Sequence, residues 1–408
     1  MAPLGARGAA VYAVAMQTPP PDADALAHSA HLRRIIQEQI IAAGGAIPFS
    51  RFMELALYAP GLGYYSAGAA KFGAEGDFVT APELGPLFAA CVADAIAPVL
   101  RQLGPDATFV ELGGGSGAFA EVVLQRLQAL DALPARYAIL EPSADLRQRQ
   151  QQRLRERLEP RLAASVEWLD TPLQQSWDGV LFANEVIDAL PTPRFSLRAG
   201  AVLEEHVALD GEGNFIRSDR PADALLTAAV RHVEAQLEAP FAEGYRSELL
   251  PQLPYWLQAV IGGLDRGALL FVDYGYPRRE YYQPQRSEGT LRAFRRHRVS
   301  DDVHAWPGLQ DLTASVDFTA LAEAGHGAGF EFAGYCTQAS FLIGNGLAQR
   351  LAEAEAGARD EAARYRLRQE VKRLTLPQEM GERFQAMGFQ RGVEFGAAFL
   401  AGDLSWRL

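Results

Sequence analysis

The stretch Phe109–Leu127 reads FVELGGGSGAFAEVVLQRL, and it governs how the rest of the chain is interpreted. Its first residues predict a short apolar strand, glycines stand at 113, 114, 115 and 117, and residues 119–130 have the apolar spacing of a helix. This order points free backbone N–H groups of a helix N-terminus at a ligand, and glycine allows close approach because it has no Cβ. A purely structural turn is the alternative reading.

Two classes of ligand fit the glycine loop. Gly113, Gly115 and Ala118 match the dinucleotide fingerprint G-x-G-x-x-G/A. Glu111, Gly113, Gly115 and Gly117 match the first motif of methyltransferases that use S-adenosylmethionine (SAM). A carboxylate at Glu111 would repel a pyrophosphate, whereas it would attract the sulfonium and ammonium groups of SAM. The acid therefore favours SAM as the cofactor, held by these four residues, and makes an NAD-dependent oxidoreductase the remote alternative.

The surrounding chain alternates short apolar strands with helices, which predicts a doubly wound, Rossmann-like α/β sheet. Strands are expected at 107–112, 136–140, 165–169, 178–183 and 267–275. We expect a disordered leader over 1–30, a helical flank over 31–105 with one helix at 82–103, and a SAM-binding core over 106–275. A hairpin near 195–216 interrupts this core, an inserted lobe follows at 276–330, and strands and helices over 331–408 complete the sheet.

Composition excludes several classes of protein. The net charge of −12 argues against nucleic acid as a partner, because phosphates require a basic surface. No run approaches 18 apolar residues, so no membrane insertion is expected. Two isolated cysteines predict no metal site and are typical of a reducing cytoplasm. A mitochondrial matrix location would apply only if the acid-free N-terminus were a transit peptide, and Met16 is an alternative start. The oligomeric state cannot be predicted from this sequence.

Three further residues are candidates for holding the cofactor. Glu141 ends the next strand, where an acid accepts from ribose hydroxyls of either cofactor, although it could be an ordinary loop acid. Trp168 could cover an adenine ring or pack in the core, and Asp170 could accept from the adenine amine.

Polar residues also follow the strand at 178–183. Asn184, Glu185 and Asp188 stand at the carboxyl edge of the predicted sheet, which is the ligand-binding edge of open α/β sheets. Methyl transfer needs a positioned nucleophile and removal of a proton, so these residues are the candidate catalytic groups. Capping of a helix is the alternative role for the acids.

Several longer segments resemble one family, the MidA-like methyltransferases. They are GYYSAGAAKFGAEGDFVTAPELGPLF, VELGGGSGAF, ANEVIDALPTPRF, LLFVDYGY and the GTLRAFRRH…GLQDLTASVDFTAL block, and the resemblance runs from about residue 31 to about 400. These are SAM-dependent enzymes whose mitochondrial members act in assembly of respiratory complex I by symmetrically dimethylating an arginine of a core subunit. The resemblance thus implies a protein arginine methyltransferase with a protein partner, possible examples being complex I subunits.

The resemblance also gives a role to residues that spacing alone does not explain. Asp77 and Thr80 in its GDF-x-T-x-PE motif are expected near the cofactor. On the substrate side we expect the other matching positions, which are Pro82, Glu83, Asp273, Tyr274, Asp311, Thr313 and Asp317.

The chain departs from the family at one position. Relatives commonly carry Gly-Pro-Gly in the loop, whereas this chain has Gly113-Gly114-Gly115. Glycine in place of proline leaves the loop freer before the cofactor binds, with a modest entropic cost on ordering. A non-catalytic assembly factor that keeps the SAM-binding fold is therefore a second hypothesis.

Overall fold

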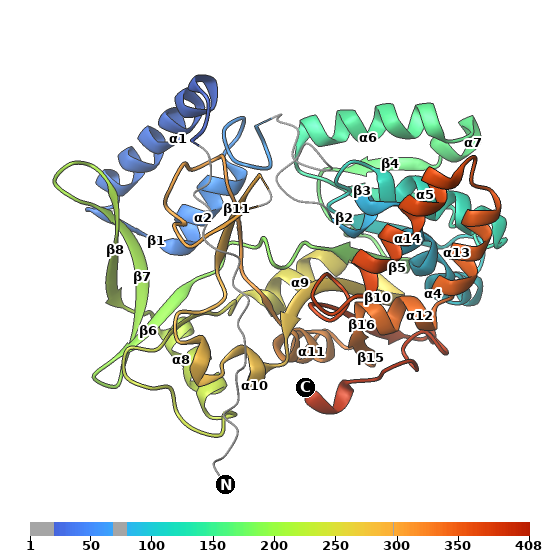
Figure 1. Ribbon diagram of the computed structural model, residues 1–408. Helices are drawn as coiled ribbons and strands as arrows, with labels where there is room; N and C mark the ends of the chain where they lie inside the picture. Colours follow the sequence, from blue (N-terminus) through green and yellow to red (C-terminus); the bar gives the residue numbers. More distant parts are fainter. Residues whose placement is uncertain (1–19, 68–79, 297) are drawn as a thin grey trace, which may run out of the picture.

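The fold is described from a computed structural model, which describes residues 20–67, 80–296 and 298–408. Figure 1 shows two halves: a large sheet flanked by helices on the right, and a smaller sheet with α1, α2 and α8 on the left. The chain crosses between the halves more than once, and the hairpin that contains β11 stands between them.

The large sheet has the order β15-β16-β10-β5-β2-β3-β4, and β14 extends β10 at its end. The strands β4, β3, β2, β5 and β10 run parallel, and β16 is antiparallel to both of its neighbours. The parallel part is the doubly wound α/β sheet that the alternating strands and helices predict. Its strands are β2 (Thr108–Leu112), β3 (Arg136–Leu140), β4 (Val166–Leu169), β5 (Trp177–Asn184), β10 (Leu264–Tyr276), β14 (Val316–Asp317), β15 (Glu331–Thr337) and β16 (Phe384–Arg391).

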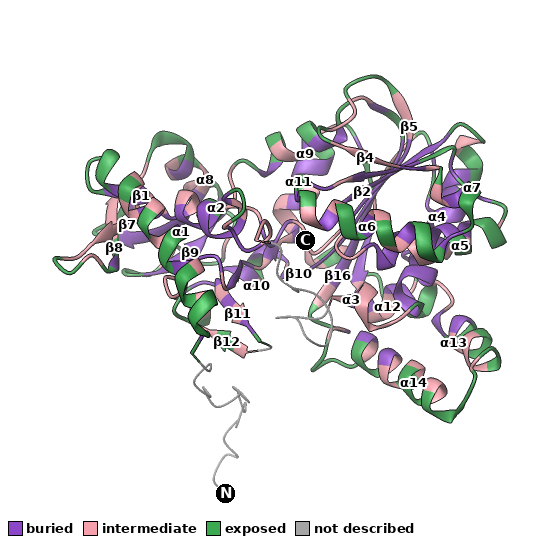
Figure 2. Cartoon of the chain, turned by 90° about the horizontal axis from the view of Figure 1, so that it is seen from above, coloured by how far each residue is buried: buried purple, intermediate pink, exposed green. Residues whose placement is uncertain are grey.

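Helices cover both faces of this sheet. Successive strand residues point to opposite sides, so neighbouring residues of one strand pack against different helices. Phe109 packs in one apolar cluster with α4 (Leu87–Leu103), α5 (Ala118–Ala129) and the C-terminal helices. Val110 packs in the other with α9 (Leu253–Ile261) and α11 (Phe318–Gly327). Figure 2 shows the strands buried between helices whose outer faces are exposed.

Two smaller sheets form the other half. A five-stranded sheet contains β1 (Ala46–Pro48), β6 (Arg194–Arg198), β7 (Ala201–Leu209), β8 (Phe215–Pro221) and β9 (Arg246–Glu248). A three-stranded sheet contains β11 (Arg292–Arg295), β12 (Arg298–Ser300) and β13 (Asp311–Thr313). The segment expected to be a hairpin near 195–216 therefore forms three strands of a larger sheet, and the N-terminal flank adds β1 to it.

The N-terminal flank differs from expectation in two places. The first helix, α1 (Ala23–Ala42), begins after an Asp22 N-cap, so residues 23–30 are helical and do not belong to a disordered leader. The helix expected over 82–103 is split into α3 (Ala81–Leu84) and α4. Pro86 lies at the break because proline disfavours helical backbone in the residue before it, here Gly85.

The inserted lobe also ends earlier than expected. Val316 of β14 pairs with Gly275 of β10, and α11 packs on the large sheet, so the end of the 276–330 segment lies with the core. Residues 331–408 complete the sheet through β15 and β16, and α12 begins at Gln338 directly after β15.

The remaining helices lie around these sheets. They are α2 (Phe49–Tyr58), α6 (Ala144–Arg157), α7 (Pro160–Ala163), α8 (Ala224–Glu234), α10 (Arg278–Tyr281), α12 (Gln338–Gly344), α13 (Leu347–Ala356), α14 (Glu361–Thr375) and the short 3-10 helices η1 (Pro284–Arg286) and η2 (Ser405–Arg407). Within the described part of the chain, no helix is both long and apolar enough to cross a bilayer. Cys91 and Cys336 are free, buried thiols.

Candidate active site

A cleft of about 1810 Å³ lies between the two halves of the molecule. At one end it is lined by the glycine loop after β2 and by the ends of β3 and β4. Its middle is lined by the loop after β5 and by the end of β10, and its far end by the β11–β12 hairpin. The cleft therefore follows the carboxyl edge of the parallel strands, where open α/β sheets bind ligands.

The glycine loop forms one end of this cleft, which is called the cofactor end because the cofactor is expected there. Residues 113–116 line it, whereas Gly117 lies behind them as the N-cap of α5. A Cβ built on Gly115 meets no protein atom within 4 Å, and the backbone there has a φ of +51°. The position thus opens onto space that a ligand can use, and it has the left-handed conformation that favours glycine.

Gly114, where relatives commonly carry proline, is closely packed. A Cβ at this position would lie 2.8 Å from Cγ2 of Ile139 and 3.0 Å from Nε2 of Gln150. The packing of Ile139 and Gln150 against Gly114 therefore limits part of the freedom that glycine would otherwise add.

Glu141 lies at the end of β3 with its carboxylate buried and facing the cleft. Oε1 accepts a hydrogen bond from Ser143 N at 2.9 Å, and Oε2 accepts one from Gln150 Nε2 at 3.3 Å. The same Gln150 amide donates to Gly115 O at 2.9 Å. Gln150 therefore fixes Glu141 relative to the glycine loop.

The sequence analysis did not identify Gln150 as part of the site. Most residues of α6 are polar, yet Leu146, Gln150 and Leu154 are buried on one face at a spacing of four. A glutamine between two leucines on such a stripe is the signal that could have revealed it.

Glu111 and Trp168 do not line the cleft. Glu111 is buried under the loop, where Oε2 accepts from Tyr137 Oη at 2.8 Å, and burial raises the pKa of its carboxyl to about 8. Trp168 Nε1 donates to Gln150 Oε1 at 2.8 Å. Both were expected to touch the cofactor. The structure places both side chains one layer behind the lining of the cleft. Their strand positions point toward the α5–α6 side of the sheet.

Asp170 does line the cleft, at the end of β4. Its side chain is 88% exposed and pairs with Arg147 Nη1 at 2.6 Å. Arg147 also donates to the carbonyls of Glu141 and Leu169, so it ties the ends of β3 and β4 together. Arg147 is a second positioning residue that the sequence analysis missed.

The segment before α4 closes the cofactor end. Thr80, Pro82 and Glu83 line the cleft, and Glu83 accepts a hydrogen bond from Ser116 Oγ in the glycine loop. Glu83, expected on the substrate side, therefore contacts the cofactor loop. Asp77 lies outside the described residues.

The loop after β5 brings Asn184 and Glu185 into the middle of the cleft. Asn184 Nδ2 donates to Glu185 Oε1 at 3.0 Å, and Glu185 N donates to Val272 O at 2.9 Å. Burial, with a smaller contribution from the charge of Asp188, raises the pKa of Glu185 to about 8. Its φ of +53° lies in the left-handed region, which is uncommon for a residue with a side chain.

Asp188 lies beside Glu185, and burial raises the pKa of its carboxyl to about 7. Asp273, from β10, is buried and does not line the cleft. Its Oδ2 accepts from the backbone N of Ile187 at 3.0 Å and of Asp188 at 3.3 Å. Asp273 therefore acts on the site through the loop that carries Asp188.

Two buried acceptor atoms in this region lack a partner. Asn184 Oδ1 and Asp188 Oδ1 form no hydrogen bond within the described part of the chain. Buried acceptors in folded proteins are nearly always satisfied. Since both residues line the cleft, these oxygens are positioned to accept from N–H groups of a ligand.

Aromatic hydroxyl groups and Asp311 complete the middle of the cleft. Tyr65 Oη donates to Asp311 Oδ1 at 2.9 Å, and Tyr58 Oη donates to Ala189 O at 2.9 Å. Tyr274 Oη donates to Thr313 Oγ1. All of these hydroxyl-bearing side chains and Asp311 line the cleft. The two stacked tyrosines come from α2 and the turn after it. Tyr65 lies in one of the segments that resemble the family, but neither tyrosine was assigned to the site.

Asp317 does not belong to this cleft. It caps α11 by accepting from Ala320 N and forms a 3.1 Å ion pair with Arg278. It lines a separate cavity of about 560 Å³ between α8, α9 and α11. Its expected role on the substrate side is replaced by a structural one.

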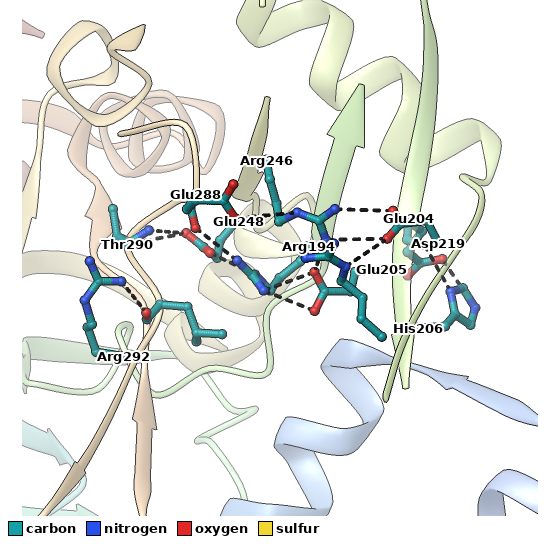
Figure 3. A network of polar contacts seen from close by, with 12 residues as sticks. Arg194, Glu204, Glu205, His206, Asp219, Arg246, Glu248, Glu288, Thr290 and Arg292 are labelled. Atoms are coloured by element: carbon teal, nitrogen blue, oxygen red, sulfur yellow. Dashed lines mark hydrogen bonds and ion pairs between the residues drawn. The ribbon is translucent and has the colours of Figure 1, made fainter. Parts of the chain in front are cut away.

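A buried ion network supports the far end of the cleft (Figure 3). Arg194 donates to Glu248 at 3.0 Å and to Glu205 at 3.0 Å, and Arg246 donates to Glu205 at 2.6 Å. Glu248 Oε2 also accepts from Thr290 N at 2.7 Å. Because Thr290 lines the cleft, the network fixes the segment that leads into β11.

Comparisons with known proteins agree with this geometry. Residues 91–336 match a family model of S-adenosyl-L-methionine-dependent methyltransferases. A crystal structure of a Burkholderia thailandensis protein bound to S-adenosyl-homocysteine is 42% identical, with a TM-score of 0.88, and the match covers 96% of this chain and all of that one. Protein arginine methyltransferase NDUFAF7, mitochondrial, of Danio rerio is 29% identical over 85% of this chain and 83% of its own. The Drosophila melanogaster homolog is 29% identical over 91% and 88%.

Proposed function

Because this chain belongs to the family of SAM-dependent methyltransferases, we propose that it methylates an arginine nitrogen of a partner protein. SAM supplies an electrophilic methyl group when bound. Residues of the chain that fit this cofactor are the open position at Gly115 and the buried, cleft-facing carboxylate of Glu141. A carboxylate at this place suits two ribose hydroxyls.

The observation that carries the arginine assignment is the set of acceptors in the middle of the cleft. Asn184 Oδ1 and Asp188 Oδ1 are buried and have no hydrogen-bond partner among the described residues, and the carboxyls of Glu185 and Asp311 lie beside them. A guanidinium offers five N–H donors and a delocalised positive charge, and it accepts none. It would satisfy both oxygens and lower the energetic cost of ionising the buried carboxyls.

The same residues perform the proton chemistry in this proposal. Asn184 orients the attacking nitrogen, while Glu185 and Asp188 hold the guanidinium and accept its proton. Their raised pKa values, about 8 and about 7, suit general bases near neutral pH. Asp273 positions the loop and has no direct contact with the substrate.

The test compares Glu185→Gln and Asp188→Asn with the parent protein. We expect each variant to bind SAM normally by calorimetry but to lose methyl transfer by about 100-fold or more, as for loss of a general base. Glu156→Gln, an exposed acid on α6, is the matched control. Transfer is measured with labelled SAM and a lysate of the source cell, followed by mass spectrometry of the labelled proteins.

Two outcomes would contradict the proposal. Full activity in both variants would remove these acids from the mechanism, and a product methylated at lysine or a carboxylate would exclude arginine. SAM binding without transfer to any protein would favour a non-catalytic assembly factor. The family resemblance extends the proposal to a respiratory complex I subunit as the partner and, for a bacterial chain, to action in the cytoplasm.

A further inference from the structure

The β11–β12 hairpin gives the far end of the cleft a basic and partly apolar surface. Its residues that line the cleft are Arg292, Phe294, Arg296, Arg298 and Val299. Phe294 and Val299 pair across the two strands, so their side chains share one side of the hairpin. Val299 is 54% exposed. We call this set of five residues the hairpin surface.

The base of the hairpin is packed against the rest of the molecule. Ala293 and Leu291 are buried in the apolar cluster that also contains α1 and α2. Before β11, Thr290 is fixed by Glu248 of the ion network. The surface is therefore a formed feature of the fold.

Strand pairing places the hairpin surface next to Asp311, one of the acids in the middle of the cleft. Phe294 of β11 pairs directly with Asp311 of β13, and Arg292 pairs with Thr313. Paired strands lie about 4.8 Å apart, and an extended chain rises about 3.3 Å per residue. A substrate residue that reaches Asp311 would thus have neighbours, within roughly two to four positions, beside Arg292 or Arg296.

The middle of the cleft is lined by acidic side chains, whereas its far end is lined mainly by basic ones. The middle of the cleft carries Glu185, Asp188 and Asp311. The far end carries the hairpin arginines together with Arg286, against Glu288 and Asp301. The ion pair between Arg292 and Asp301 is 3.5 Å long with Asp301 88% exposed, and exposed pairs of this kind neutralise little.

We propose that the hairpin surface binds acidic side chains that flank the acceptor residue of the substrate protein. This inference rests on the proposed function and names its substrate class: an acceptor arginine with Asp or Glu within a few residues and an apolar side chain for Phe294 and Val299. Arginine suits this role because its guanidinium binds carboxylates in a bidentate manner. A nucleic acid is disfavoured because its phosphates would lie beside the acids in the middle of the cleft.

The experiment uses three synthetic peptides that each contain one arginine, flanked by Glu, Gln or Lys residues. Binding to the full-length protein with S-adenosyl-homocysteine is measured by fluorescence anisotropy, and methyl transfer is measured separately with labelled SAM. We expect the Glu-flanked peptide to bind about tenfold more tightly than the Gln-flanked one, and the difference to shrink at high salt, as for charge-assisted hydrogen bonds.

Variants of the surface identify the residues responsible. Arg292→Gln and Arg296→Gln should each weaken binding of the Glu-flanked peptide about five- to tenfold. Neither should change SAM affinity. Arg155→Gln, which removes an exposed arginine of α6, is the control and should leave both affinities unchanged. Arg296→Glu should shift the preference toward the Lys-flanked peptide, a gain that a misfolded variant could not show.

Failure of this inference can be told apart from failure of the proposed function. If lysate proteins are methylated at arginine but flanking charge has no effect on peptide binding, the surface assignment is wrong and the proposed function stands. If the Glu-flanked peptide binds with the expected dependence on Arg296 but nothing is methylated, the surface stands and the enzymatic proposal fails. An RNA oligonucleotide that binds more tightly than any peptide, through the same arginines, would overturn the inference in favour of nucleic acid.

Discussion

The two ends of the cleft are built in different ways. The cofactor end is formed mainly by one contiguous loop, residues 113–116, whose closest supports, Gln150 and Glu141, lie on the next strand and helix. The acceptor end combines α2, the loop after β5, the end of β10 and the β11–β12 hairpin, and it depends on a buried ion network. One end follows from local sequence, whereas the other exists only after distant segments have packed together.

The largest effect should come from the contiguous end. In Gly115→Val a branched side chain would fill the open space at Gly115 and would adopt an unfavourable positive φ. We expect SAM binding to become undetectable by calorimetry, with a folded protein by circular dichroism. Gly211→Val, in an open turn with no atom within 4 Å of the new Cβ, is the control. Unchanged SAM affinity in Gly115→Val would show that the loop does not hold the cofactor.

The distant end should instead respond to loss of a buried charge. Glu248→Gln leaves the buried Arg194 with one fewer charged partner and weakens the hold on Thr290. Breaking a buried pair in this way costs about 3 kcal/mol. We expect denaturant unfolding to show this loss and KM for the protein substrate to rise, while SAM affinity is kept. If stability and KM are both unaltered, the network does not support the acceptor end.

The two ends should also differ in their response to pH. Burial raises the pKa of Asp188 to about 7 and of Glu185 to about 8, so kcat/KM for the protein substrate should rise up to tenfold per pH unit below pH 7 and level off above pH 8. SAM affinity should vary much less.

The same shifts affect stability with a defined sign. The folded protein retains protons that the unfolded chain releases near pH 4, so the free energy of unfolding should fall as pH rises from about 4 to about 8. Asp188→Asn and Glu185→Gln should each reduce this slope. An unchanged slope in both variants would contradict the raised pKa values.

The smallest effect concerns the supports of the cofactor end. Glu141→Ala removes the carboxylate that we propose accepts from the ribose hydroxyls and should lower SAM affinity about tenfold, as expected for loss of a hydrogen bond to a charged group. The SAM affinity of Glu141→Gln should lie between that of Glu141→Ala and that of the parent protein. Asp170→Ala is the informative comparison, because that acid is exposed and paired with Arg147. If Asp170→Ala lowered SAM affinity more than Glu141→Ala, Asp170 and not Glu141 would be the residue that binds the ribose.

The sequence predicted the sheet, the glycine loop and the identity of the acids after β5, because each depends on a local pattern. It misplaced Glu111 and Trp168, because strand alternation gives two faces without saying which one meets the ligand. Asp317 was assigned to the site through a motif, yet its position just before a helix makes it a cap. Tyr58 and Tyr65 could not be predicted, since they reach the cleft through contacts more than 100 residues distant in sequence.

Glu185 has a consequence for how this protein could change under selection. Its left-handed backbone costs roughly 1–2 kcal/mol for a residue with a Cβ, and glycine would avoid that cost. Screens for thermal stability without an activity readout should therefore enrich glycine at position 185. The selected proteins would be more stable but would have lost a carboxylate from the cleft. At position 185, the residue that favours stability differs from the residue that the proposed chemistry requires.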